Sequence, residues 1–470
     1  MQKIILTFAF FAIIVIFTSC APDATIGEAA HKITIGAPET EDPYLHELML
    51  GVISGPEPTA NGTGPTLTKE YQDIGVVSIR NNDYYDDRLD LEGIFNCGGN
   101  TYPSWEGCDA NDDANYDWTK SDAQYQSYID GGFIPFLRIG GEWENQANGH
   151  DFKGPQNATQ EANWIIAANK MVDRYENWSA KPNAFTYLNI WTEYPGGQFW
   201  DRSNPDFIKF WVNAYKSIKA AHPELKVGGP GFVPGVSMKV SEGDGSLAES
   251  LLQEMYKQNL KLDWFGWHTF GSDPTVYAKI AQGYQDLLDG TGAYKNVPWS
   301  GTSFFADTEV FVDAYGNGTG EAGKETAISV STARGAAVLT AGWISLQYAD
   351  IQGAFYYRGN DQGSPGSAPK KGKPGRDNST LPGLFTSAGE YKPAADAFRL
   401  WSQLTNNYET LLSISDEGRP NEIWTLAAKN SSGEVAVLVA NPSDTDTTIS
   451  INSASSVISI PAGAVKLIEL

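Results

Sequence analysis

Phe185-Thr186-Tyr187-Leu188-Asn189-Ile190-Trp191 is a run of β-branched, aromatic and aliphatic residues with the length of a buried strand. Residues 205–221 follow it, and their apolar side chains recur at helical spacing. Leu225-Lys226-Val227-Gly228 is a second β-type run. A strand, a helix and another strand in this order are typical of a parallel α/β unit. This stretch therefore predicts an α/β fold.

The same alternation extends along the chain in both directions. It predicts further helices over residues 162–175, 247–258, 276–288 and 325–341. It predicts eight strands over residues 50–53, 75–80, 133–139, 185–191, 225–228, 262–268, 303–307 and 351–357. Eight such units are typical of a (β/α)8 TIM barrel, which we assign to residues 46–404.

The pattern changes near residue 405, where short β-type runs replace the alternation. Residues 422–428 and 434–439 are two such runs, and Asn430-Ser431-Ser432-Gly433 between them is typical of a hairpin turn. We predict a small antiparallel β-sandwich over residues 405–470. A strand near Ile33-Thr34-Ile35 is a candidate to join it.

The N-terminus has the layout of a bacterial lipoprotein signal peptide over residues 1–20. Lys3 precedes an apolar run over residues 4–17, which is too short to span a bilayer, and Thr18-Ser19-Cys20 ends it. We expect lipidation of Cys20, a linker over residues 21–45 and a place in the cell envelope, anchored to the outer membrane. Ordinary signal cleavage is the alternative.

Charge and cysteine content narrow the classes of partner. A formal net charge of −24 disfavours nucleic acid, while 14 Trp suit stacking on sugar rings, although large cores also use Trp. In an exported protein, Cys97 and Cys108 can form a disulfide, with two free thiols as the alternative. We predict no metal and no cofactor, because no cluster of His and Cys has the spacing of ligands.

Two glutamates follow predicted strands directly. Glu193 comes after the fourth strand and Glu309 after the seventh. In a TIM barrel the loops at the carboxyl ends of the strands build the active site. Two carboxyl groups facing each other there are what glycosidic bond cleavage needs. We therefore expect Glu193 and Glu309 to form a catalytic pair.

Six stretches in order resemble clan A glycoside hydrolases, and most closely family 39, the family of β-xylosidases and α-L-iduronidase. They are Val77–Asp87, Trp191–Glu193, Ala221–Pro230, Trp267–Phe270, Thr308–Glu309 and Gly383–Pro393. The resemblance implies an exo-acting, retaining glycosidase with Glu193 as acid/base and Glu309 as nucleophile. The two carboxyl groups of such an enzyme lie about 5–5.5 Å apart.

Three positions depart from the family pattern. Thr192 replaces the Asn before the acid/base, Asn82 replaces a His, and Phe270 replaces a Tyr. The single hydroxyl group of Thr can make fewer hydrogen bonds to a sugar than the amide group of Asn. The departures put β-xylosidase activity in doubt and suggest an altered sugar, such as one from an algal polysaccharide.

Other residues near the predicted strand ends are candidates for substrate binding. Arg80 could instead be a buried salt-bridge partner, His268 a core histidine, and Glu142 rivals Glu144. A basic cluster over residues 370–376 is either a solvated loop or a contact for an acidic glycan. The substrate-binding candidates are Arg80, Asn82, Trp143, Glu144, Trp191, Thr192, His268, Phe270, Tyr357 and Arg358.

Two other functions remain open. An endo-acting clan A hydrolase would act on a long polysaccharide, and a non-catalytic lipoprotein would only bind glycans. Either way the expected partner is an oligo- or polysaccharide, and the membrane is contacted through the lipid anchor alone. The sequence leaves the oligomeric state open.

Overall fold

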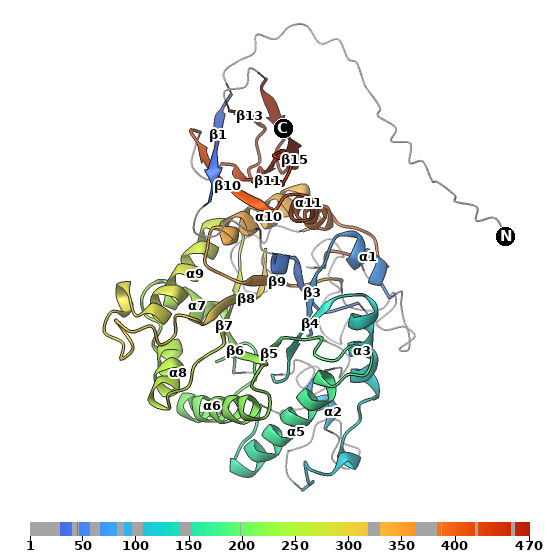
Figure 1. Cartoon of the computed structure of the whole chain (residues 1–470), viewed down its shortest axis with the longest axis vertical. Coiled ribbons are helices and arrows are strands. Elements are labelled where there is room, and N and C mark those ends of the chain that lie inside the picture. The colour runs from blue at the N-terminus through green and yellow to red at the C-terminus, as the bar shows by residue number, and fades with distance from the viewer. Residues whose placement is uncertain are drawn as a thin grey trace, which may run out of the picture.

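The computed structural model describes residues 29–39, 45, 47–56, 66–81, 89–95, 107–141, 153–197, 199–317, 330–361, 383–386, 388–418, 422–452 and 456–470. Eight parallel strands close into a barrel in sequence order, which confirms the predicted TIM-type barrel (Figure 1). They are β2 (Gly51–Ile53), β3 (Ser78–Arg80), β4 (Ile134–Arg138), β5 (Tyr187–Asn189), β6 (Lys226–Phe232), β7 (Trp264–Phe270), β8 (Glu309–Gly316) and β9 (Gly353–Tyr356).

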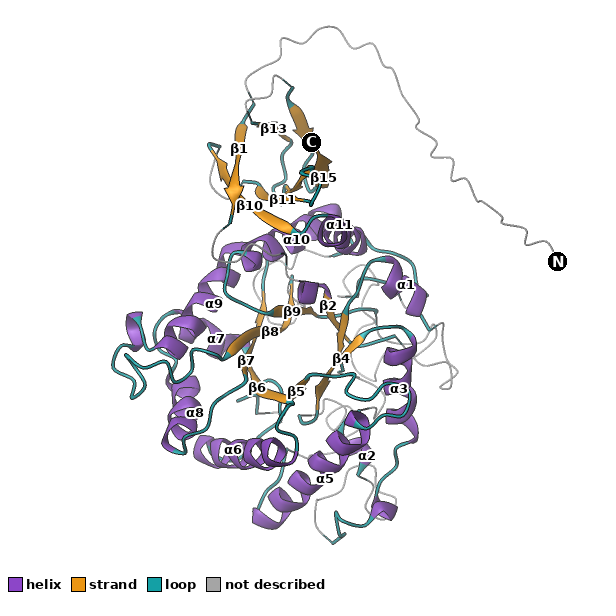
Figure 2. Cartoon of the chain, in the orientation of Figure 1, coloured by secondary structure: helices purple, strands orange, loops and turns teal. Residues whose placement is uncertain are grey.

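Helices surround this ring of strands, as Figure 2 shows. The helix α6 (Asn204–Ala221) shows how the local sequence starts a helix: the Ser203 hydroxyl caps its N-terminus, and Pro205 lies in its first turn. The others are α1 (Thr68–Asp73), α2 (Leu91–Ile94), α3 (Thr119–Asp130), α5 (Ala158–Glu176), α7 (Pro234–Ser241), α8 (Ser246–Lys257), α9 (Pro274–Asp289), α10 (Ala333–Gln347) and α11 (Pro393–Asn407), with short 3-10 helices η1 (Glu47–Leu50), η3 (Asp113–Asn115) and η4 (Gly292–Tyr294).

The inside of the barrel is packed with side chains. Phe136, Trp264, Phe311 and Phe355 form an aromatic layer, and the Phe136 ring centroid lies 4.6–5.5 Å from the other three. Inward-facing residues alternate along a strand. Phe311 therefore separates the residues at the amino end of β8 from those at its carboxyl end.

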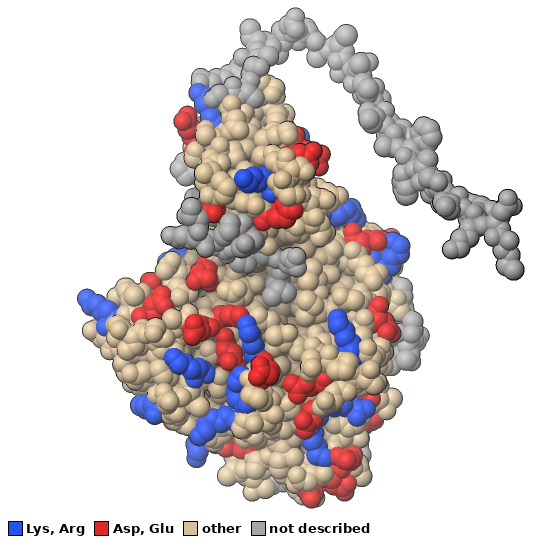
Figure 3. All heavy atoms as spheres, viewed as in Figure 1, with Lys and Arg blue, Asp and Glu red and all other residues tan. Residues whose placement is uncertain are grey.

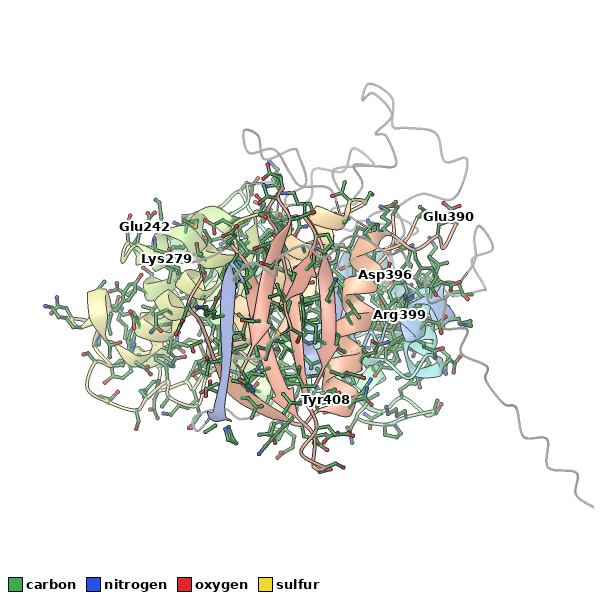
Figure 4. All side chains as sticks on the ribbon, turned by 90° about the horizontal axis from the view of Figure 1, so that it is seen from above. Glu242, Lys279, Glu390, Asp396, Arg399 and Tyr408 are labelled. Atoms are coloured by element: carbon green, nitrogen blue, oxygen red, sulfur yellow. The ribbon has the colours of Figure 1, made fainter. Side chains whose placement is uncertain are left out.

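A second sheet packs beside the barrel. Its order is β14-β13-β1-β10-β11-β12-β15. The helix α11 runs alongside these strands (Figure 4). The strands are β1 (His31–Pro38), β10 (Thr410–Asp416), β11 (Trp424–Lys429), β12 (Val435–Ala440), β13 (Thr447–Ile451), β14 (Ile458–Ile460) and β15 (Val465–Glu469).

This sheet confirms the predicted second β-rich domain. The strand expected near residues 33–35 does join it, since β1 pairs antiparallel with β10 and parallel with β13. One detail differs, because these strands form a single sheet that contains one parallel pair. Ile33, Val437 and Ile449 share a core in that sheet.

The prediction of the seventh barrel strand was wrong. Residues 303–307 form no strand, and residues 304–307 form turns, after which the Thr308 amide donates to Phe305 O at 3.0 Å. Phe304 and Phe305 pack outside the barrel against Tyr256 and Trp299, with ring centroids 4.8 and 5.3 Å apart. The strand itself is Glu309–Gly316. It begins where the predicted strand was expected to have ended.

The surface carries both signs of charge. Acidic and basic side chains are interspersed on the face in Figure 3. Some pairs link neighbouring elements, as when Arg202 contacts Glu161 of α5 at 2.7 Å. Within the described part of the chain, none of the helices has both the length and the apolar character needed to cross a membrane.

Candidate active site

The structure places Glu309 at the amino end of the barrel, away from Glu193. Glu309 is the first residue of β8 and aligns with Trp264, the first residue of β7. Its carboxylate pairs with Lys226, the first residue of β6. Because all eight strands are parallel, these first residues share one end. The expected pairing of Glu193 with Glu309 is therefore wrong, and its cause is the misplaced seventh strand.

Glu193 lies at the opposite end, four residues after β5. Its backbone has φ = 51°, a left-handed conformation that is uncommon outside glycine and often occurs at functional sites. The next residue, Tyr194, bridges to Phe232 at the end of β6, which fixes the turn. The Glu193 side chain is 19% exposed. A carboxyl group at the carboxyl end of the barrel, partly open to solvent, can reach a substrate.

His268 connects Glu193 to a second carboxylate. It lies near the end of β7 and is 2% exposed. Its Nδ1 is 3.5 Å from Glu193 Oε1, and its Nε2 is 3.5 Å from Asp313 Oδ1. Both contacts exceed ordinary hydrogen-bond lengths, as is frequent in active sites without substrate. One imidazole ring thus stands between two carboxyl groups.

Asp313 is the acidic residue that sequence reasoning missed. It lies on β8 four residues beyond Glu309, or about 13 Å further along the strand. Its side chain is fully buried. Its Oδ2 accepts hydrogen bonds from Asn189 Nδ2 at 2.6 Å and from Arg80 Nη2 at 3.2 Å. Within the described part of the chain, its Oδ1 has no hydrogen-bond partner.

Arg80, at the end of β3, links the two catalytic candidates. Its Nη2 also donates to Thr192 Oγ1 at 3.1 Å, beside Glu193. Burial lowers the pKa of Arg80 to about 10, although the charge of Asp313 opposes this. Its Nε and Nη1 are buried and have no hydrogen-bond partner among the residues that the structure describes. Arg80 is therefore a salt-bridge partner of Asp313 that retains unused donors.

Phe270, Tyr357 and Arg358 gather near the same end of the barrel. The rings of Phe270 and Tyr357 meet edge to face with centroids 5.9 Å apart. Arg358 is buried, and its Nε donates to Asn360 O at 2.7 Å. Both aromatic rings are only partly buried, so they remain available for contact with a sugar.

A buried ion pair supports the loop after β9. Lys392 Nζ lies 2.8 Å from Asp361 Oδ1 and 2.7 Å from Oδ2. Burial raises the pKa of Asp361 and lowers that of Lys392, because it disfavours both charges. Their mutual attraction opposes both shifts. The pair ties this loop to the start of α11.

The prediction that Trp191 binds substrate was wrong. Its ring is fully buried among Trp164, Phe207 and Phe210, with centroids 5.7–6.1 Å away. These residues belong to α5 and α6. Trp191 therefore fills the layer between the barrel wall and its helices, and its role is packing.

Several predicted residues lie outside the described part of the chain. They are Cys20, Asn82, Cys97, Glu142, Trp143, Glu144 and the basic cluster over residues 370–376. Cys108 is disulfide-bonded, and the pairing with Cys97 stays a prediction. Among the described residues, no group of three His, Cys, Asp or Glu side chains is placed to hold a metal ion.

Comparison with known proteins relates the chain to a family of glycoside hydrolases. The model of the family "Glycosyl hydrolases family 39" matches residues 105–320, a segment that contains Glu309 as well as Glu193, His268 and Asp313. The resemblance seen in the sequence is therefore confirmed. The match supports assignment to the glycoside hydrolases.

Solved structures share the fold over nearly the whole chain. A glucosidase from Croceicoccus marinus is 16% identical with a TM-score of 0.64, over 92% of this chain and 84% of that chain. The GH39 enzyme from Xanthomonas axonopodis pv. citri is 17% identical with a TM-score of 0.61, over 96% and 97%. A monomeric β-xylosidase from Caulobacter crescentus CB15 is 14% identical with a TM-score of 0.60, over 90% and 84%. Likeness at such identities establishes the fold alone.

Proposed function

We propose that this protein is a retaining glycoside hydrolase that uses Glu193 as acid/base and Asp313 as nucleophile. One observation carries the proposal. Glu193 and Asp313 lie at the carboxyl end of the barrel, on two sides of the same histidine ring. That end carries the active site in TIM-barrel enzymes, and two carboxyl groups are what the reaction needs.

Each residue has a role in the two steps. Glu193 gives its proton to the leaving-group oxygen while Asp313 Oδ1 forms a bond to the anomeric carbon and the glycosidic bond breaks. Glu193 then takes a proton from water, whose oxygen attacks the anomeric carbon and releases Asp313. Oδ1 suits the attack, because Arg80 and Asn189 occupy Oδ2.

Covalent labelling tests whether Asp313 is the nucleophile. Because its side chain is fully buried, substrate reaches Oδ1 only if the space beside it opens. A 2-deoxy-2-fluoro glycoside with a good leaving group should leave the sugar bound to Asp313, as detected by mass spectrometry of peptides. Asp313→Asn should not be labelled, and Glu309→Gln should be labelled like the wild type. Label on any other carboxylate contradicts the nucleophile assignment.

The resemblance to family 39 is the support for retention, which product stereochemistry tests separately. Proton NMR of the first-formed sugar should show the anomeric configuration of the substrate. Inverted product would make Asp313 a base that activates water. Glu193→Gln should slow substrates with poor leaving groups by about 10²- to 10⁴-fold. It should affect activated aryl glycosides much less, because these need no proton.

We propose that the enzyme is exo-acting on a glycoside related to β-xylosides. We propose further that the sugar it releases is not xylose itself, because Thr192 and Phe270 depart from the family pattern. A panel of aryl glycosides followed by plant and algal oligosaccharides tests this. Single-sugar products support exo action, and mixed oligosaccharides favour an endo-acting hydrolase. Glycan binding without turnover across the panel would support the non-catalytic alternative. Turnover of xylosides faster than every galactoside, arabinoside and uronide would contradict an altered sugar.

We also propose that the protein is exported and lipid-anchored in the cell envelope through Cys20. The support is the sequence layout alone, namely an apolar run followed by Thr18-Ser19-Cys20. Labelling of cells with a radioactive fatty acid should mark the wild type but not Cys20→Ala. Equal labelling of both would contradict the proposal.

A further inference from the structure

His268 is enclosed by the groups of the candidate site. Glu193 faces its Nδ1 and Asp313 faces its Nε2, each at 3.5 Å. On the β6 side a methyl group on Gly231 would lie 2.9 Å from Nε2, so that neighbour is backbone without charge. Arg80 is the cation nearby, and it is held by Asp313. Among the described residues, these two carboxylates are the charged groups in direct contact with the ring.

The protonation state of the ring follows from its donors. A neutral imidazole carries one N–H and one lone pair. A neutral ring could donate from Nε2 to Asp313, but its Nδ1 lone pair would then face Glu193 Oε1, because an acid/base holds its proton on the other oxygen, toward the leaving group. Only an imidazolium presents an N–H to both carboxyl groups; at 3.5 Å these contacts are ion pairs, and neither ring nitrogen forms a hydrogen bond with a described residue. At 2% exposure water cannot relieve that repulsion, so the geometry favours the charged form.

We infer that His268 is held as an imidazolium between Glu193 and Asp313 and positions both carboxyl groups, an inference that rests on the proposed function. The electrostatics agree with this arrangement. Burial acts to lower the pKa of His268, but Asp313 and Glu193 together raise it above the ordinary 6.5.

A shared cation suits the movement of charge in the reaction. Before the first step Asp313 is anionic and Glu193 carries the proton. After it, Asp313 is bonded to the sugar and neutral, while Glu193 is anionic. The negative charge has thus moved from one side of the ring to the other. His268 contacts the anionic carboxylate in both states, so it stabilises each without moving.

The pH profile of kcat/KM tests this role. His268→Gln keeps a donor but removes the charge, so both limbs of the profile should move to higher pH by about one unit. His222→Gln is a matched control. His222 is also buried and contacts a carboxylate, with Nδ1 2.6 Å from Glu176 Oε2, but it ends α6 away from the site. The control should keep the wild-type profile even if it is less stable. A His268→Gln enzyme with lower activity but unmoved limbs would overturn the inference.

A second measurement does not depend on activity. Nitrogen-15 NMR of the protein, which has five histidines, shows the protonation of each ring, and His268→Gln assigns the signal. Imidazolium shifts at both nitrogens of His268 above pH 6.5 support the inference, and their loss in Asp313→Asn supports it further. Shifts of a neutral ring overturn it. Absence of turnover on every glycoside would instead overturn the proposed function.

Discussion

At the scale of single residues, the Asn189 side chain contacts both Asp313 and the backbone that leads to Glu193. Its Oδ1 accepts from the Trp191 amide at 3.1 Å, and its Nδ2 donates to Asp313 Oδ2 at 2.6 Å. The first contact orients the amide group so that its donor faces Asp313. The same contact holds the turn that leads to Glu193. One buried side chain therefore sets both the position of Asp313 and the exit of the chain from β5.

Asn189→Asp should lower kcat by about 10²-fold, a loss typical of small misplacements in active sites. The variant has the same shape, but it replaces the donor with a carboxylate that repels Asp313. Asn189→Ala should lose less activity, because it adds no charge. Steady-state kinetics with an aryl glycoside, alongside circular dichroism to verify folding, measure both. Equal activity of Asn189→Asp and wild type would contradict this role.

His268 also links stability to pH. Its pKa in the folded protein is raised above 6.5, so the folded state binds the proton more tightly than the unfolded state. The resulting stabilisation is complete below pH 6.5 and is lost as the pH rises through the folded pKa. Thermal denaturation of wild type and His268→Gln should show a melting-temperature difference that shrinks toward alkaline pH. A difference that grows with pH would contradict the charged ring.

At the scale of elements, the amino end of the barrel holds a polar cluster of its own. Glu309 pairs with Lys226, and the Lys226 ammonium lies 5.4 Å from the centre of the Tyr187 ring. Burial and the charge of Glu309 raise the pKa of Tyr187, which keeps the phenol neutral. The cluster closes the floor of the barrel beneath the aromatic layer. Its role is structural.

Glu309→Gln should lower the free energy of unfolding by about 1 kcal/mol, since both charged partners are partly exposed. Its kcat should match the wild type, because the aromatic layer and the length of β8 separate it from the site. Urea denaturation and kinetics on the same preparation test both expectations. A loss of activity as large as that of Asp313→Asn would contradict the placement of Glu309 outside the active site.

The errors of sequence reasoning share a physical cause. The position of Glu193 at the carboxyl end of the barrel could be predicted because it follows a clear apolar run that contains β5. In β8, Phe304 and Phe305 resembled a strand because their burial comes from packing outside the barrel. Asp313 interrupts an apolar strand and carries no local signal. Asn189, Arg80 and His268 stabilise it from other strands, and such partners are visible only in three dimensions.

Trp191 was misassigned because side-chain alternation applies only within a strand. The strand β5 ends at Asn189, and the chain then turns outward. Two residues further, the indole ring therefore points to α5 and α6 rather than to the barrel mouth. The barrel itself was predictable, because its order depends on the repeated alternation of strands and helices and not on the exact ends of any one strand.

At the scale of the whole molecule, the N-terminal strand β1 lies within the sheet that the C-terminal strands form. It lies between β13 and β10 and is the strand that connects the β13–β14 pair to the rest of the sheet. His31, at its start, is fully buried and contacts Asp416 of β10 at 2.7 Å. One face of the sheet carries the core that contains Ile33, and the opposite face packs on α10 and α11. The N-terminal segment therefore completes a domain that is otherwise built from the C-terminal sequence.

Ile33→Ala should lower the free energy of unfolding by about 2–5 kcal/mol, the usual effect of truncating a buried Ile. Ile33 is 1% exposed and aligns with both Asp416 and Ile451, so its side chain fills the core between the two halves of the sheet. Ile35→Ala, on the same strand but only partly buried, should cost less. Urea denaturation measures both, and kcat of the folded variants should stay at the wild-type value, since β1 lies outside the barrel. If Ile35→Ala were the more damaging change, the core would not depend on β1 in this way.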